Sequence, residues 1–373
     1  MTIFLIIYMA RSHIKMKRKR NRDEALNSCE IYYTSGRVRM IMKKGKILLV
    51  TMIMCALMLG GCGNSAATQK AEDGKYEIIC TTFPQYDWVK NLIAGNEDNF
   101  TLTLLTEKGG DLHNFQPSAT DIAKVSSCDL LIYVGGESDA WVSDTLRTAQ
   151  NNDMHVINMM DVISSDLKEE ELVEGMQEEH EDEEEHSDGQ EEIEYDEHIW
   201  LSLKNAQKLV AGISTELQAL DAANASLYEK NETAYMDELN KLDQEYQSVA
   251  DAAQKDTLLF ADRFPFRYLV DDYSINYYAA FVGCSAETEA SFETVAFLAG
   301  KIDELSLDTV LVIDGSDEKL AKAIIDNTSD KNQQILVLDS MQSVSKKDIE
   351  DGETYLSSMS SNLDILRQAL GEN

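Results

Sequence analysis

Apolar segments of strand length alternate with segments of helical periodicity along most of the chain. One such set lies in the first half of the chain, and a second set lies near the C-terminus. Alternation of this kind predicts mainly parallel sheets covered by helices. The expected strands are residues 76–83, 100–106, 128–134, 154–159, 257–261, 276–281, 308–313 and 334–338, and the expected helices are 86–94, 118–126, 141–149, 290–304, 317–326 and 356–370.

A long amphipathic segment separates the two sets. Residues 227–254 contain neither Pro nor Gly, and their apolar residues recur at helical spacing. A flexible linker would be rich in Gly or Ser, so this segment predicts a rigid helix of about 40 Å at 1.5 Å per residue. The predicted fold is therefore α/β, with one lobe at 76–223, a linking helix at 224–254 and a second lobe at 255–373.

The N-terminal 61 residues differ in charge from the rest. They carry 12 Lys or Arg and 3 acids, whereas the whole chain has a formal net charge of −34, which argues against nucleic acid as a partner. The uncharged apolar run 47–59 follows three lysines and is too short for a transmembrane helix of about 20 residues. We therefore predict a signal peptide at 40–61 and a tether at 62–75, and residues 1–39 are either an extension or a start-site artefact.

The residues that end the signal peptide have a specific pattern. Leu-Gly-Gly-Cys at 59–62 resembles a bacterial lipobox, which implies lipid attachment at Cys62. Three later cysteines, Cys80, Cys128 and Cys284, form no CxxC motif and are predicted to be free thiols.

Four polar residues are candidate metal ligands. His113 in GGDLHNFQPS and His198 in DEHIW each precede a predicted helix, and Asp262 and Asp339 each end a predicted apolar strand. Ligands in α/β folds bind beyond the carboxyl ends of the strands. Zinc accepts nitrogen and oxygen ligands in tetrahedral geometry, and Mn(II) favours carboxylates with imidazole.

Several motifs occur in a fixed order that resembles a known family. CTTFPQYDWVKNLIAGN, GGDLHNFQPSATDIAKV, CDLLIYVGGESDAWV and DEHIWLSLKNAQKLVAGI are similar to segments of the metal-binding lipoproteins of zinc and manganese ABC transporters, and the similarity covers residues 76–370. It implies two Rossmann-like lobes joined by a long rigid α-helix, with the metal in the interlobe cleft. It further implies ligand roles for His113 and His198, and for Asp339 in VLDS.

The third ligand departs from the family pattern. A His or Glu is expected in H-x-x-F-x-Y, but the matching position in FADRFPFRY is Ala261. Asp262 is the predicted substitute, and Glu287 or Glu289 is the alternative. Two histidines with two carboxylates resemble the manganese members, so Zn(II) and Mn(II) both stay open.

The predicted loop 165–197 is dominated by acidic residues. Positions 169–197 hold 17 acids together with His180 and His186, and zinc members of the family often carry such an insert. So much charge predicts that it lacks fixed structure. It is either a weak collector of cations near the cleft or a solvated loop without specific binding.

Together these features predict a binding protein rather than an enzyme. The expected protein is a monomeric receptor, lipid-anchored through Cys62 on the extracytoplasmic face of the cell membrane, that captures Zn(II) for an ABC transporter permease. The alternatives are a Mn(II) receptor, a secreted zinc-dependent hydrolase and an adhesin or acidic scaffold. The chain contains no HExxH or G-x-S-x-G motif, which disfavours the hydrolase.

Overall fold

The computed structural model describes residues 74–110, 112–177, 194–285 and 289–371. The predicted signal peptide, Cys62, His180, His186 and Glu287 lie outside the described residues. Among the described residues, no helix has the length and apolarity needed to cross a membrane.

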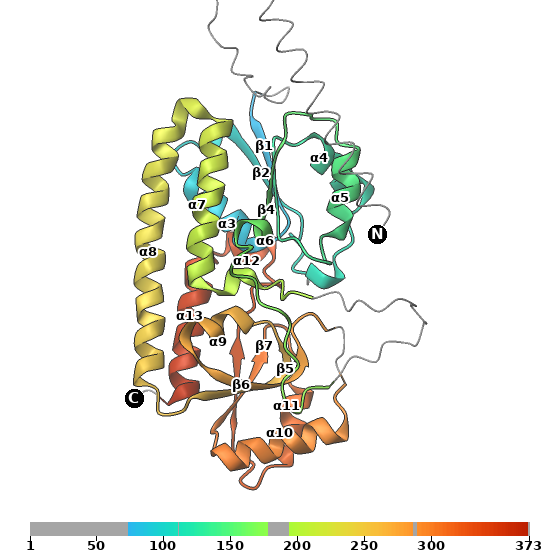
Figure 1. Ribbon diagram of the computed structural model, residues 1–373, viewed down its shortest axis with the longest axis vertical. Coiled ribbons are helices and arrows are strands. Elements are labelled where there is room, and N and C mark those ends of the chain that lie inside the picture. The colour runs from blue at the N-terminus through green and yellow to red at the C-terminus, as the bar shows by residue number, and fades with distance from the viewer. Residues whose placement is uncertain (1–73, 111, 178–193, 286–288, 372–373) are drawn as a thin grey trace, which may run out of the picture. The chain divides into compact units, whose positions relative to one another are not determined.

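The first lobe contains a sheet of four parallel strands in the order β2-β1-β3-β4. Figure 1 labels β1, β2 and β4 of this sheet. Its central strand β1 pairs with β2 on one side and β3 on the other, and Ile78 lies opposite both Leu102 and Leu130. All four strands coincide with predicted apolar runs. They are β1 Tyr76–Cys80, β2 Phe100–Leu104, β3 Leu130–Tyr133 and β4 His155–Asn158.

Helices of this lobe begin at residues suited to capping. Thr82 and Gln85 form a capping box before α3, and Ser118 and Asp121 form another before α4. Ser202 accepts a hydrogen bond from the Asn205 N–H at the start of α7. The helices are α3 Phe83–Leu92, α4 Ala119–Ser127, α5 Ala140–Arg147, α6 Met159–Val162 and α7 Leu203–Leu220, with short 3-10 turns η1 Glu97–Asn99, η2 Leu112–Asn114, η3 Ile199–Leu201 and η4 Ala222–Asn224.

The predicted linking helix is α8, Ala225–Ala252. Figure 1 shows it lying beside α7, and it also contacts α3 and α13. Its apolar and aromatic residues are buried on one face, and the Tyr246 hydroxyl donates a hydrogen bond to the Met359 carbonyl at 2.6 Å. Because α8 packs against helices that adjoin both sheets, it is held along its length rather than exposed as a free connector.

The second lobe repeats the arrangement with the strand order β6-β5-β7-β8, again all parallel. Its strands are β5 Thr257–Phe264, β6 Asn276–Val282, β7 Thr309–Ile313 and β8 Gln334–Leu338. Its helices are α9 Arg267–Tyr273, α10 Phe292–Leu305, α11 Lys319–Asp326, α12 Lys346–Glu350 and α13 Tyr355–Leu370.

Strand β5 corrects one boundary of the sequence analysis. The predicted strand ended at Ala261, but β5 continues to Phe264, so Asp262 lies within the strand. The pairing of β5 with β6 shifts register between Phe260 and Arg263. The polar residues Asp262 and Arg263 lie at this irregularity and interrupt the apolar pattern of the strand. The sequence pattern therefore predicted that the strand ends before them.

Successive strand residues alternate between two cores. Ile78 and Phe260 belong to a central core that includes α3, α7, α8 and α13, whereas Ile79 and Leu259 face separate clusters on the outer sides of the two sheets. The central cluster contains residues of both lobes, so it joins the two sheets into one packed unit.

The acidic segment provides a second correction. Residues 169–177 were predicted to lack fixed structure, yet Glu169 forms a β-bridge with Tyr195, and Gln177 donates a backbone hydrogen bond to Ala280 at 2.9 Å. Met176 is buried. Backbone pairing and the burial of Met176 thus order this segment despite its high content of acidic residues. Residues 178–193 lie outside the described part of the chain.

Candidate metal centre

His113 lies in the 3-10 turn η2 that follows β2. Its Nδ1 is 2.8 Å from the Ser138 Oγ and 3.8 Å from the Glu197 Oε2. The side chain is 12% exposed. These contacts occupy Nδ1, so His113 presents Nε2 to its other neighbours.

His198 is fully buried at the start of η3. The Asp196 Oδ1 accepts hydrogen bonds from the His198 backbone N–H at 2.8 Å and from the ring Nδ1 at 3.0 Å. The Trp200 ring lies edge-on at 5.4 Å between centroids, and its Nε1–H donates to the Ser340 carbonyl of the second lobe at 2.9 Å. His198 is thus held by its own segment while its neighbour Trp200 reaches across to the other lobe.

The two imidazoles face each other through Nε2, at 3.1 Å. A histidine that binds metal through one nitrogen usually donates its other N–H to a carboxylate or another acceptor. The Nδ1 of His198 has such a partner in Asp196, and the Nδ1 of His113 lies beside the Ser138 hydroxyl. With both Nδ1 atoms protonated, two nitrogen lone pairs oppose each other, which a shared cation relieves. Two nitrogens on a tetrahedral zinc at 2.0–2.1 Å are about 3.3 Å apart, close to the separation seen here.

Cys284 is the third member of this cluster. Among the described residues, His113, His198 and Cys284 are the group whose ligand atoms all lie within 4.8 Å of one another. Cys284 follows β6, and its backbone N–H donates to the Glu170 Oε1 at 3.1 Å. A Cβ added at the preceding Gly283 would lie 3.2 Å from the His198 Cε1, so this backbone is in close contact with the imidazole.

Several buried carboxylates surround the cluster. Asp196 and Glu197 are 2% and 3% exposed, and the Glu197 Oε2 has no hydrogen-bond partner. Burial raises the pKa of Glu170 and of Glu197. Burial first, and then the charges of Asp196 and Glu170, raise the pKa of the Cys284 thiol. A cation bound beside these groups would favour their ionised forms and offset the cost of burying them.

The two predicted carboxylate ligands are not members of this group. Asp262 lies within β5, and its Oδ1 accepts a hydrogen bond from the Arg263 N–H at 2.9 Å. Asp339 directly follows β8, and its Oδ1 accepts from the Met341 N–H at 2.7 Å. Burial and the nearby charge of Asp314 raise the pKa of Asp339 to about 6. The structure thus brings together the two predicted histidines and places a cysteine beside them.

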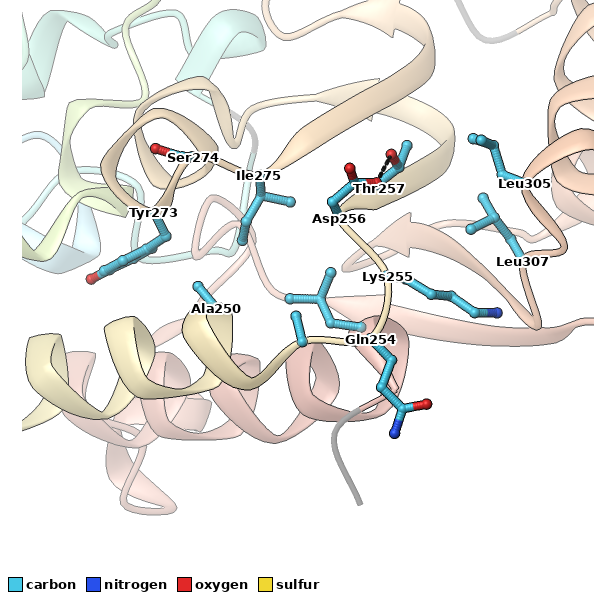
Figure 2. Close-up of a pocket in the computed structure, with 12 residues that line it drawn as sticks. Ala250, Gln254, Lys255, Asp256, Thr257, Tyr273, Ser274, Ile275, Leu305 and Leu307 are labelled. Atoms are coloured by element: carbon cyan, nitrogen blue, oxygen red, sulfur yellow. Dashed lines mark hydrogen bonds between the residues drawn. The ribbon is translucent and has the colours of Figure 1, made fainter.

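Asp262 and the alternative ligand Glu289 instead line a pocket of about 770 Å³. The pocket also includes Arg263, Asp314 and Asn114, which directly follows His113. Asp262 and Glu289 therefore share a pocket with a residue adjacent in sequence to His113, but none of the cluster residues lines that pocket. A separate pocket, of about 360 Å³, is drawn in Figure 2. It is lined by the end of α8, the start of β5 and residues near Tyr273, and it contains none of the cluster residues.

The sequence carries one sign that the third ligand lies outside the segment FADRFPFRY. The pattern H-x-x-F-x-Y fits a second register, in which Phe266 and Tyr268 follow Arg263 at the required spacing. Arginine carries donors only and cannot bind a cation, so the ligand must come from another position. Cys284 lies two residues beyond β6, the next strand along the chain.

Comparisons with known proteins identify the family of this chain. The profile of the family described as "Zinc-uptake complex component A periplasmic" (ZnuA) matches residues 78–369. The zinc-binding lipoprotein AdcA of Streptococcus pneumoniae R6 is 30% identical over 328 residues, which are 88% of this chain and 61% of AdcA. The chain thus spans 61% of the length of that relative.

Two further comparisons cover nearly the whole length of the protein compared. The high-affinity zinc uptake system protein ZnuA of Bacillus subtilis 168 is 27% identical over 324 residues, 86% of this chain and 97% of that protein. The crystal structure of the Zn(II)-bound ZnuA-like domain of Streptococcus pneumoniae AdcA superposes with a TM-score of 0.63 at 26% identity, covering 80% of this chain and all of that domain.

Proposed function

Because this chain belongs to the zinc-uptake complex component A family, we propose that it captures Zn(II) outside the cytoplasm and delivers it to an ABC transporter permease. Relatives named for zinc binding and zinc uptake support this cargo. The family is one of solute-binding proteins, so the protein is a receptor rather than the hydrolase considered as an alternative.

The observation that carries the proposal is the pair formed by His113 and His198. Their Nε2 atoms lie 3.1 Å apart, and each Nδ1 contacts an oxygen acceptor. This arrangement presents two nitrogen ligands to one point, and buried carboxylates add negative charge. Neutral imidazole and nearby carboxylates suit Zn(II), and Mn(II) is the second candidate because carboxylates also suit it.

Release to a permease requires the ligands to separate. The segment that carries His198 is bonded to the second lobe. The Tyr268 hydroxyl donates to the Asp196 carbonyl at 2.8 Å, and the Tyr355 hydroxyl donates to the Trp200 carbonyl at 2.7 Å. A shift between the lobes therefore acts directly on the His198 backbone. We propose that the permease shifts these contacts and weakens the site, while a lipid at Cys62 keeps the protein at the membrane.

The proposal is tested by titrating the metal-free protein with Zn(II) and Mn(II) in competition with a chelator. His113→Ala and His198→Ala are expected to abolish the tight site. His155→Ala is the matched control, since His155 pairs with Glu216 at 2.6 Å and is not part of the cluster. Tight Zn(II) binding that survives both cluster substitutions would overturn the proposal, and a tighter Mn(II) site would reassign the cargo.

A further inference from the structure

We propose that the Cys284 thiolate is a ligand that the second lobe contributes to the bound cation, so that the site includes two nitrogens and one sulfur. This inference rests on the proposed function and specifies how the same site selects its cargo. It starts from the cluster in which one ligand atom each of His113, His198 and Cys284 lies within 4.8 Å of the other two.

Sheet geometry explains why Cys284 reaches the histidines. Strands β5 and β6 are parallel neighbours, and Phe264 pairs with Val282 at their carboxyl ends. Cys284 lies two residues beyond that pair, at the edge of the sheet where ligands bind in α/β folds. The intervening Gly283 has its backbone against the His198 ring, and an added Cβ would also approach the Phe264 carbonyl at 2.9 Å.

Arg263 accounts for the change of ligand. In the second register of H-x-x-F-x-Y, which uses Phe266 and Tyr268, Arg263 takes the place of the metal-binding residue, and it lies near the end of β5. Its Nη1 donates to the Ser285 carbonyl at 3.3 Å. The guanidinium thus holds the segment that carries Cys284 instead of binding a cation. In this chain the ligand is therefore supplied from the end of β6 instead of the end of the adjacent strand β5.

Sulfur in the site predicts selectivity. A thiolate is a soft ligand that favours Zn(II), whereas Mn(II) prefers oxygen ligands. Cys284 therefore favours Zn(II) over Mn(II), even though the surrounding carboxylates suit both ions. The two histidines come from the first lobe and the cysteine from the second, so the bound cation connects the lobes.

The test uses Co(II) as a spectroscopic substitute for Zn(II). The wild-type protein is expected to show a near-ultraviolet thiolate-to-cobalt charge-transfer band together with visible d–d bands. Cys284→Ser is expected to lose the charge-transfer band and about 100-fold or more in Zn(II) affinity. Cys128→Ser is the matched control, because the Cys128 thiol donates to the Val125 carbonyl at 3.3 Å, a bond that a serine hydroxyl can replace.

The outcomes separate this inference from the proposed function. A charge-transfer band that persists in Cys284→Ser, or an unchanged Zn(II) affinity, would overturn the role of Cys284. If His113-dependent Zn(II) binding remains in that case, the proposed function survives. If wild type binds neither ion, both proposals fail.

A second measurement covers the case in which Cys284→Ser does not fold. In the wild-type protein, Zn(II) is expected to slow the alkylation of Cys284 by iodoacetamide, followed residue by residue by mass spectrometry. Equal rates of modification with and without Zn(II) would overturn the inference.

Discussion

The Asp196 carboxylate is the main support of His198, and its removal makes a sharp prediction. Its Oδ1 accepts from both the backbone N–H and the ring Nδ1–H of His198, and the residue is 2% exposed. Asp196→Asn retains the size and one acceptor oxygen but removes the charge. The imidazole then becomes a weaker ligand, and the site loses a negative charge that attracts the cation.

The expected effect is a loss of Zn(II) affinity of about 10-fold to 100-fold, the range for groups that orient metal-binding histidines. This corresponds to about 1.4–2.7 kcal/mol of binding free energy. We place the effect in this range rather than above it because asparagine can still accept the Nδ1–H bond. The Tyr268 hydroxyl bonds to the backbone carbonyl of Asp196, so that interlobe contact remains.

The assay is Zn(II) titration against a chelating competitor, with thermal unfolding in EDTA to show that the variant is folded. Asp166→Asn is the matched control, since the Asp166 carboxylate pairs with Lys208 at 2.8 Å away from the cluster. Exposed pairs of this kind contribute little, and the control is expected to bind as wild type does. A folded Asp196→Asn protein with wild-type affinity would refute the reasoning that the carboxylate tunes His198.

Three further predictions follow from other parts of the chain. Burial raises the pKa of Asp87 to about 6, so the folded state keeps a proton that the unfolded state has released, and stability falls as pH rises from about 4 through 6. Asp87→Asn can still accept the Tyr355 N–H bond seen at 3.1 Å. In denaturant titration the variant should therefore have the stability of wild type at pH 4 and be more stable than wild type at pH 8, by at most about 3 kcal/mol. A stability difference independent of pH would contradict this. Deletion of residues 178–192 should remove weak sites in calorimetry and leave the tight site, whereas loss of the tight site would assign those histidines a direct role. Asp339→Asn should lower Zn(II) affinity if the predicted fourth ligand binds, and unchanged affinity would remove Asp339 from the ligand set.

Much of the fold could be predicted because its determinants are local. Each strand of the two sheets overlaps an apolar run bounded by polar residues or turns, and α8 follows from a long helical pattern without Pro or Gly. Capping residues such as Ser118 mark where helices begin. These signals depend only on neighbours in the sequence.

The failures arise where distant segments meet. Asp262 was predicted to end a strand because the apolar run stops before it, whereas pairing with β6 extends β5 to Phe264. Residues 169–177 seemed too charged to be ordered, yet Gln177 pairs with Ala280 of β6. In both cases contacts with another strand outweigh the local composition.

The sequence by itself determined the α/β character and the long helix and marked the two histidines as candidate ligands, because periodicity and motifs are read along the chain. Only the tertiary structure decided which third side chain joins them. Parallel strands bring their carboxyl ends to one edge regardless of sequence separation, and Cys284 meets His113 and His198 there. Proximity of that kind has no local signature, since each residue alone is compatible with an ordinary buried side chain.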